Sequence, residues 1–322
     1  MLSEYITNKI LCQAKKLDSC VIGKVMTFQM WKWGTERKGN RNKIGTLPEP
    51  PDSNSLSSDE SIMHVLPLQS GIIYGIVRSR RLKSSLGINL SPTDQKLCSF
   101  NCVYCHYGCT EILTDSVIRY EERFPTPKQV EDALRERLQT TTEIPLYITF
   151  SGNGEPSMHT EFVEIVDRVI QVKNDLVPEV KTAILSNSST AHIPEIRDAI
   201  LKLDTPIMKL DAGDVSTFRQ VNRPARGVHY DKLTEALAGM AGITIQTCLF
   251  TGSVSNSEEP HIASWIAQIA RIDPREVQVY TVDRPPADSG IQPVPPERLA
   301  GIVERATLAT GIPVRLFGPR QV

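Results

Sequence analysis

Long hydrophobic runs are missing from this sequence, and charge of neither sign dominates it. The apolar stretch at residues 21–30 is interrupted by Lys24, so neither a signal peptide nor a membrane-spanning helix is expected. The 36 basic and 37 acidic side chains nearly cancel, to a net charge of −1, which gives no protein-wide attraction to nucleic acid or to a membrane. We therefore expect a cytoplasmic protein without a membrane partner.

A disulfide framework is also missing. The seven cysteines are odd in number and unevenly spaced, unlike the paired cysteines of small secreted domains. No second C-x2-C or His pair follows the one cysteine cluster at zinc-finger spacing. The cysteines therefore indicate a reducing compartment and chemistry at one short stretch of the chain.

The composition, 40% hydrophobic and 23% charged, is that of a globular protein. Residues 1–47 form a basic N-terminal extension in which Lys and Arg accompany Trp31 and Trp33. Such a mixture can bind an RNA backbone and stack on bases, although many basic arms are merely solvated. Residues 48–65 are rich in Pro, Ser and acids and are predicted to be a linker. Residues 71–322 are predicted to be the core domain.

The most informative stretch contains three thiols in C-x3-C-x2-C spacing, at Cys98, Cys102 and Cys105. Three thiolates from one short loop can hold a four-iron cluster and leave one iron open to a small ligand. A zinc site completed by His106 and Cys109 is the alternative.

This stretch resembles the cluster loop of the radical S-adenosylmethionine (SAM) superfamily, and further motifs resemble a branch of Fe–S oxidoreductases similar to wyosine-forming tRNA enzymes. The motifs follow the family's order from about residue 71 to the C-terminus and lie at residues 79–82, 85–92, 96–98, 150–156, 185–188, 208–211 and 280–286. The resemblance implies a [4Fe–4S] cluster on Cys98, Cys102 and Cys105, with SAM on the fourth iron. It also implies reductive SAM cleavage and a reductant such as flavodoxin or ferredoxin.

Short apolar runs alternate with amphipathic stretches from residue 86 onward, which is typical of βα units. Strands are predicted at residues 86–90, 145–151, 180–186, 206–211, 243–250 and 276–282. Helices are predicted at residues 127–139, 160–173, 193–203, 229–240, 259–271 and 296–309. This pattern, with the resemblance, predicts an α/β fold: a partial (β/α)6 TIM-like barrel of the radical SAM type with an N-terminal extension. A doubly wound open sheet is the alternative.

A glycine-rich turn follows the second predicted strand and contains Gly152, Asn153, Gly154 and Glu155. By itself this pattern is equally typical of a tight strand-to-helix turn, because glycine permits close backbone approach. It resembles the Gly-Gly-Glu-Pro motif of the family, whose polar atoms bind the SAM amino group. The resemblance therefore implies SAM binding by these four residues.

Three more residues are expected to contact SAM. Ser186 and Asn187 end the third predicted strand, where barrel loops bind ligands, although both residue types also form caps and turns. Tyr104 precedes the last cysteine of the motif, and its place in the family motif implies a position near the adenine.

The fourth predicted strand carries Lys209 and Asp211 on one face, because strand side chains alternate. Charges inside a barrel must pair or take part in chemistry. We interpret them as catalytic residues beside SAM or substrate, and a purely structural ion pair is the alternative.

Taken together, these features predict a radical SAM enzyme that abstracts hydrogen from an unidentified substrate. The family branch and the basic extension point first to an RNA base, and then to a peptide or a small metabolite. Wyosine-forming enzymes carry a second cluster on further upstream cysteines, and here only Cys12 and Cys20 precede the motif, so that particular activity is not predicted. A non-catalytic zinc or iron–sulfur binding module is the competing class.

Overall fold

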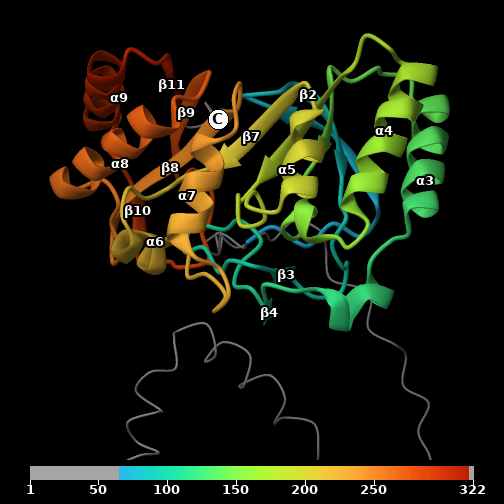
Figure 1. Ribbon diagram of the computed structural model, residues 1–322, viewed down its shortest axis with the longest axis horizontal. Helices are drawn as coiled ribbons and strands as arrows, with labels where there is room; N and C mark the ends of the chain where they lie inside the picture. The colour runs from blue at the N-terminus through green and yellow to red at the C-terminus, as the bar shows by residue number, and fades with distance from the viewer. Residues whose placement is uncertain (1–64, 319–322) are drawn as a thin grey trace, which may run out of the picture. The chain divides into compact units, whose positions relative to one another are not determined.

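Parallel strands form the centre of the computed structural model, which describes residues 65–318 (Figure 1). The central strands, in their order across the sheet, are β2 (Lys83–Ile88), β5 (Tyr147–Phe150), β6 (Lys181–Ser186), β7 (Thr205–Lys209), β8 (Thr244–Gly252) and β9 (Glu276–Thr281). Each is parallel to its neighbour. Because the strands share one direction, their following loops meet at one end of the sheet.

Shorter strands extend the sheet or lie beside it. The edge strands are β1 (Ile73–Ser79), antiparallel to β2, and β11 (Val314–Phe317), parallel to β9. The strand β10 (Ile291–Pro293) pairs with the end of β8. Away from the sheet, β3 (Leu97–Cys98) pairs with β4 (Ile112–Leu113), and this pair frames the cysteine loop.

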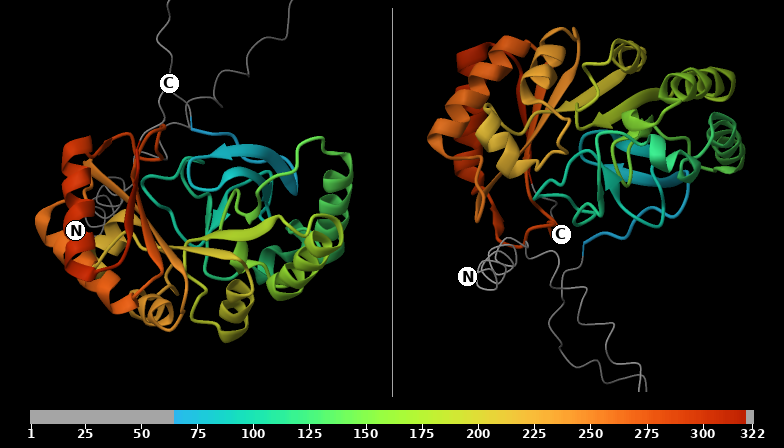
Figure 2. Two further views of the ribbon diagram at one scale, coloured as in Figure 1. Left: turned by 90° about the horizontal axis from the view of Figure 1, so that it is seen from above. Right: turned by 60° about the horizontal axis from the view of Figure 1, so that its bottom comes forward.

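Helices follow the strands and lie along the outer side of the curved sheet (Figure 2). They are α3 (Pro127–Thr140), α4 (Phe162–Leu176), α5 (Pro194–Leu201), α6 (Val215–Val221), α7 (Tyr230–Ala238), α8 (Glu259–Ile272) and α9 (Pro296–Thr310), with the 3₁₀ turns η1 (Ile118–Arg123) and η2 (Pro156–Met158). This arrangement confirms the predicted partial (β/α)6 barrel.

Local sequence explains where the helices begin. Thr126 caps α3, because its side chain accepts from the N–H of Gln129, whose own side chain accepts from the N–H of Thr126. The buried side chains of Val130, Leu134 and Leu138 then recur every four residues and face the sheet. The helix α6, which the sequence pattern did not predict, begins at a similar cap, where Asp214 accepts from the N–H of Thr217 at 2.9 Å.

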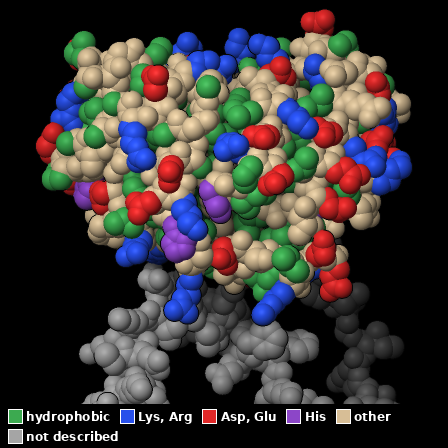
Figure 3. All heavy atoms as spheres, viewed as in Figure 1, with side chains coloured by type: hydrophobic (Ala, Val, Ile, Leu, Met, Phe, Trp, Pro, Cys, Tyr) green, Lys and Arg blue, Asp and Glu red, His purple; other side chains and the backbone are tan. Residues whose placement is uncertain are grey.

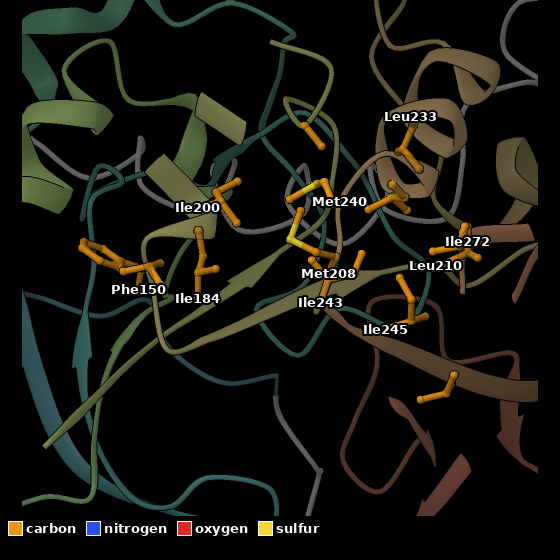
Figure 4. Close-up of a cluster of buried hydrophobic side chains, with 14 of the residues drawn as sticks. Phe150, Ile184, Ile200, Met208, Leu210, Leu233, Met240, Ile243, Ile245 and Ile272 are labelled. Atoms are coloured by element: carbon orange, nitrogen blue, oxygen red, sulfur yellow. The ribbon is translucent and has the colours of Figure 1, made fainter. Parts of the chain in front are cut away.

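A hydrophobic core lies between the sheet and the helices (Figure 4). Phe150, Ile184, Met208 and Ile245 come from successive strands, and all four are fully buried. They contact side chains such as Ile200 from α5 in one cluster. Rigid packing on this side fixes the strand ends that carry the loops described below.

Side chains bridge the two margins of the open barrel. The sheet order does not return to its start, yet Arg80, in the turn between β1 and β2, forms a 2.5 Å ion pair with Asp283, just after β9. The next residue, Arg81, lies over the ring of Tyr280, with 4.6 Å between its Cζ and the ring centroid. These contacts hold the β1–β2 turn across the mouth of the barrel.

The predicted strands and helices agree with the observed ones to within a few residues at each end. The strand predicted at 206–211 ends earlier, at Lys209, so Leu210 and Asp211 leave the sheet. The edge strands β1 and β11 were not predicted. The short strands β3, β4 and β10 were also missed, because two or three residues carry no periodic signal.

The predictions for residues 1–47 and for most of 48–65 lie outside the described residues. No helix within residues 65–318 is long and apolar enough to cross a membrane. On the face shown in Figure 3, basic and acidic side chains are interspersed over the described residues, in line with the balanced charge of the sequence.

Candidate active site

The cysteine loop is anchored by its own backbone and apolar residues. The N–H of Val103 donates to Val221 O at 3.0 Å, and the N–H of Asn101 donates to Asn222 O at 3.0 Å. Phe100 and Val103, between the cysteines, are buried, and the ammonium of Lys96 donates to Gly108 O at 2.5 Å. The loop is therefore packed and bonded at several points before any metal binds.

The three thiols of the motif line one cavity of about 300 Å³. With them the cavity brings together most of the other predicted site residues, namely Tyr104, Gly152, Asn153, Gly154, Glu155, Ser186, Asn187 and Lys209. Among residues 65–318, no three His, Cys, Asp or Glu side chains converge tightly enough to enclose a single metal ion. The thiols instead border a shared space, which suits a cluster in which each thiolate bonds a different iron.

Burial favours the protonated form of two of the three thiols. It raises the pKa of Cys98 to about 11 and that of Cys102 to about 12. Burial also disfavours the Lys96 ammonium, yet the neighbouring Cys105 and Cys98 outweigh it and raise the pKa of Lys96. A buried cation thus stands beside the thiols and offsets the negative charge that they acquire when iron displaces their protons.

Two asparagine side chains donate hydrogen bonds to cysteine sulfurs. Asn187 Nδ2 lies 3.6 Å from Cys98 Sγ, and Asn222 Nδ2 lies 3.5 Å from Cys102 Sγ. Hydrogen bonds to the ligand sulfurs are one of the means by which proteins set the potential of an iron–sulfur cluster. Asn187 was predicted as a SAM ligand, whereas Asn222 was not predicted as a site residue at all.

The glycines of the loop after β5 are required by close backbone contacts. A Cβ on Gly154 would stand 2.1 Å from the carbonyl oxygen of Leu97, and one on Gly152 would stand 2.4 Å from Asn89 Oδ1. Gly152 also has a φ of +140°, which favours glycine. This turn therefore packs directly against the residue before Cys98, so the predicted SAM loop and the cluster loop are one structural unit.

The side chain of Asn153 is fully engaged with backbone. Its Oδ1 accepts from the N–H of Gln69 at 2.7 Å, and its Nδ2 donates to the carbonyl oxygens of Gln69 and Pro92, both at 3.0 Å. The backbone N–H of Asn153 also donates to Asn89 Oδ1 at 3.0 Å, so of its polar groups only the carbonyl oxygen is left for a ligand.

Glu155 joins the loops that follow β5 and β6. Its carboxylate accepts from the N–H of Ser157 at 3.1 Å and from the N–H of Asn187. Burial raises the pKa of Glu155, and the hydrogen bonds from Ser157, Asn187 and Ser186 partly offset this effect. A buried carboxylate on the cavity wall is suited to an ammonium group, as the SAM amino group would be.

The predicted pair Lys209–Asp211 is present, with 3.0 Å between Lys209 Nζ and Asp211 Oδ1. Asp211 also accepts from Tyr104 OH at 2.5 Å, from Asn222 Nδ2 at 3.0 Å and from the N–H of Cys248 at 2.8 Å. Burial disfavours the Lys209 ammonium, but Asp211 outweighs burial and raises the pKa of Lys209.

Lys209 and Asp211 differ in whether their side chains border the cavity. Lys209 borders the cavity, and its Nζ also donates to Tyr280 OH at 3.0 Å. Asp211 does not line this cavity and has a side chain with 0% exposure. Although both were predicted to be catalytic, Asp211 contacts the side chains that orient the site, so we treat it as a positioning residue.

Comparison with known proteins identifies the family. Residues 94–259 match the Radical SAM superfamily. The chain belongs to the radical SAM superfamily. This confirms the family prediction and identifies the chain as a SAM-dependent enzyme, with a [4Fe–4S] cluster and SAM as its cofactors.

Two curated relatives match this chain over a region much longer than the cysteine motif. A UPF0026 protein of Methanocaldococcus jannaschii is 30% identical over 69% of this chain and 67% of that protein. A protein named GTPase Obg from Brachyspira hyodysenteriae is 28% identical over 83% of this chain but only 37% of its own length. This chain thus matches well under half of that longer relative.

A solved structure has the same fold. A radical SAM methyltransferase from Sphaerobacter thermophilus superposes with a TM-score of 0.54 over 74% of this chain and 67% of that chain, at 14% identity. At this identity the likeness shows the partial barrel alone.

Proposed function

We propose that Cys98, Cys102 and Cys105 hold the [4Fe–4S] cluster of a hydrogen-abstracting radical SAM enzyme. The observation that carries this proposal is the shared cavity, which all three thiols border together with the glycine-rich loop and Lys209. The hydrogen bonds from Asn187 and Asn222 to two of the sulfurs support it further. When bound, the cluster and SAM supply one-electron cleavage of SAM and the radical that abstracts hydrogen.

The proposed SAM contacts lie on three loops. Glu155 and the backbone of residues 152–154 bind the amino group, while Ser186 and Asn187 contact the ribose or the carboxylate. Tyr104 lies near the adenine, and its hydroxyl is held by Asp211. These groups are oriented by bonds among themselves, which keeps the site ordered before SAM arrives.

Lys209, which lines the same cavity, is the proposed catalytic cation. Its Nζ lies 4.8 Å from the ring centroids of both Tyr104 and Tyr280. Two aromatic faces and one carboxylate hold the ammonium in place, so it can orient a polar group of SAM or of the substrate.

Anaerobic reconstitution with iron and sulfide, followed by reduction, tests the proposal. Wild-type protein should acquire about four irons per chain and release 5′-deoxyadenosine and methionine from SAM. Separate Cys98→Ala, Cys102→Ala and Cys105→Ala variants should lose the cluster and the cleavage. Cys248→Ala is the matched control, because Cys248 is a buried thiol on β8 that does not line the cavity. A fully loaded, reduced wild type that leaves SAM intact would refute the proposed function.

An RNA base is the first substrate we propose, on the strength of the family branch and the Lys, Arg and Trp residues of segment 1–47. RNA deuterated in its bases should raise 5′-deoxyadenosine formation and transfer deuterium into that product. If neither occurs, the substrate is a peptide or a small metabolite. A flavodoxin or ferredoxin is the proposed electron donor, and it should replace the chemical reductant in the same assay.

A further inference from the structure

A second cavity of about 320 Å³ adjoins the cluster cavity. The side chains common to both walls are Tyr74, Arg81, His106, Tyr107, Ser151 and Leu185. None of the proposed cluster or SAM ligands lines the second cavity. Its lining includes residues of the β1–β2 turn and Asp283 and Arg284, which follow β9.

The described side chains around this cavity carry an excess of positive charge. Four arginines line it, namely Arg78, Arg80, Arg81 and Arg284, against one carboxylate, Asp283. Arg80 pairs with Asp283 at 2.5 Å, and Arg78 pairs with Glu143, outside the cavity, at 2.8 Å. Within residues 65–318, no carboxylate forms an ion pair with Arg81 or Arg284.

Arg81 is held firmly in place although it lacks an anionic partner. Its backbone N–H donates to Ser79 Oγ at 3.2 Å, and its guanidinium lies over the ring of Tyr280 at 4.6 Å. Tyr280 in turn accepts a hydrogen bond from Lys209. The aromatic ring fixes one face of the guanidinium and leaves its N–H edges for other partners.

One of those edges is buried and unsatisfied, because Arg81 Nη1 is inaccessible to solvent and has no hydrogen-bond partner. Leaving a charged donor unpaired inside a protein is costly, so such groups call for an explanation. A planar guanidinium matches the paired oxygens of a phosphate or a carboxylate. Because Nη1 is closed to solvent, an oxyanion in the cavity would pair with the other N–H groups of Arg81, which lines the cavity wall.

We propose that the second cavity is the substrate subsite and that Arg81, assisted by Arg284, binds a phosphate or carboxylate group of the substrate. This inference rests on the proposed function, since it places the anion beside the SAM cavity. The shared wall carries hydroxyl groups, including Tyr74 OH bonded to Ser151 Oγ at 2.6 Å, and the apolar Leu185. A substrate anchored by its anion in this cavity would extend its reactive part past that wall toward SAM.

Binding of inorganic phosphate to the full, cluster-loaded chain in the presence of saturating SAM tests this proposal. Equilibrium dialysis should show phosphate binding that weakens about tenfold or more in Arg81→Gln, since a charge-assisted hydrogen bond is lost. Arg81→Lys should fall between the two. Arg78→Gln is the matched control: it removes a charge from the same cavity, but Arg78 is 76% exposed and paired with Glu143, so phosphate affinity should stay within about twofold.

Competition with acetate distinguishes a carboxylate-bearing substrate from a phosphate-bearing one. Displacement of phosphate by acetate would indicate a carboxylate-bearing substrate, and resistance to acetate would indicate a phosphate-bearing one. Three results would overturn the inference: no binding of either anion to wild type, equal phosphate affinity in Arg81→Gln, or phosphate that competes with SAM, which would place Arg81 in the SAM site. SAM cleavage measured on the same wild-type sample keeps a failure of this subsite distinguishable from a failure of the proposed function.

Discussion

The side-chain amide of Asn222 donates to the sulfur of Cys102 at 3.5 Å, although 120 residues separate the two in the chain. The same amide donates to Asp211 Oδ2 at 3.0 Å, which orients it toward the sulfur. The carboxylate of Asp211 also pairs with Lys209 and accepts from Tyr104 OH. It thereby connects Asn222, beside Cys102, with Lys209 and Tyr104. The proposed cluster and SAM sites therefore share a single hydrogen-bond network, and substitution of one of its residues should affect both sites.

Replacing Asn222 by Ala should leave the iron content intact but make the cluster potential more negative. The lost N–H···S bond stabilises the reduced cluster, and a bond worth about 1 kcal/mol corresponds to a shift on the order of 20–60 mV for one electron. The measurement is a redox titration followed by electron paramagnetic resonance. Asn101→Ala is the control, because Asn101 belongs to the same loop but its side chain accepts from the N–H of Thr110. An unchanged potential in Asn222→Ala would mean that this contact does not reach the bound cluster.

Replacing Glu155 by Ala should weaken SAM binding by about 10- to 100-fold, because a charge-assisted contact is lost. Iron content should persist, since the carboxylate is proposed to bind SAM and not the metal. Equilibrium binding of SAM to the oxidised, loaded protein measures this effect without turnover. Loss of iron would show instead that Glu155 acts mainly through its bond to the N–H of Asn187, holding the loop beside Cys98.

Adding a methyl group at Gly154 should lower the free energy of unfolding by about 1–3 kcal/mol, because the new Cβ meets the Leu97 carbonyl at 2.1 Å. Gly301→Ala is the contrasting change: Gly301 lies in α9 with no atom within 4 Å of its added Cβ. There the helix propensity of Ala should raise stability by about 1 kcal/mol. Chemical denaturation measures the free energy of unfolding of both variants. Equal stabilities would contradict the close approach of the two loops.

Stability should fall as the pH drops below about 6.5, the ordinary pKa of histidine, partly because of His159. This side chain is buried, its Nδ1 accepts from the N–H of Glu161 at 3.0 Å, and burial lowers its pKa. In acid the unfolded chain therefore binds a proton that the folded chain resists, so the contribution of His159 is complete above pH 6.5 and is lost as the pH falls.

The variant His159→Gln isolates this effect. Glutamine stays neutral and offers one donor and one acceptor, so the variant should lose less stability than wild type between pH 7.5 and 5.5. Denaturation midpoints at the two pH values give the comparison. Parallel losses in both proteins would assign the acid sensitivity to other groups.

Much of this protein follows from local sequence. The spacing of Cys98, Cys102 and Cys105 predicts a cluster loop without any structure, because neighbouring thiols in one loop face one centre. Strand and helix positions follow from apolar periodicity and from caps such as Thr126, which act over a few residues. Strand alternation predicted that Lys209 and Asp211 share a face. The two side chains do pair at 3.0 Å, although β7 ends at Lys209 and Asp211 lies just beyond it.

Only the tertiary structure shows which of these residues border the cavity and which hold other residues in position. Asn153, expected to bind SAM, has its side chain engaged with Gln69 and Pro92, and Asp211 lies behind the cavity that Lys209 borders. Asn222 and Arg81 became visible as site residues only when the fold placed one against a sulfur and left the other without an anion. Hydrogen-bond satisfaction and burial depend on partners far away in the chain, and no local pattern of residues records them.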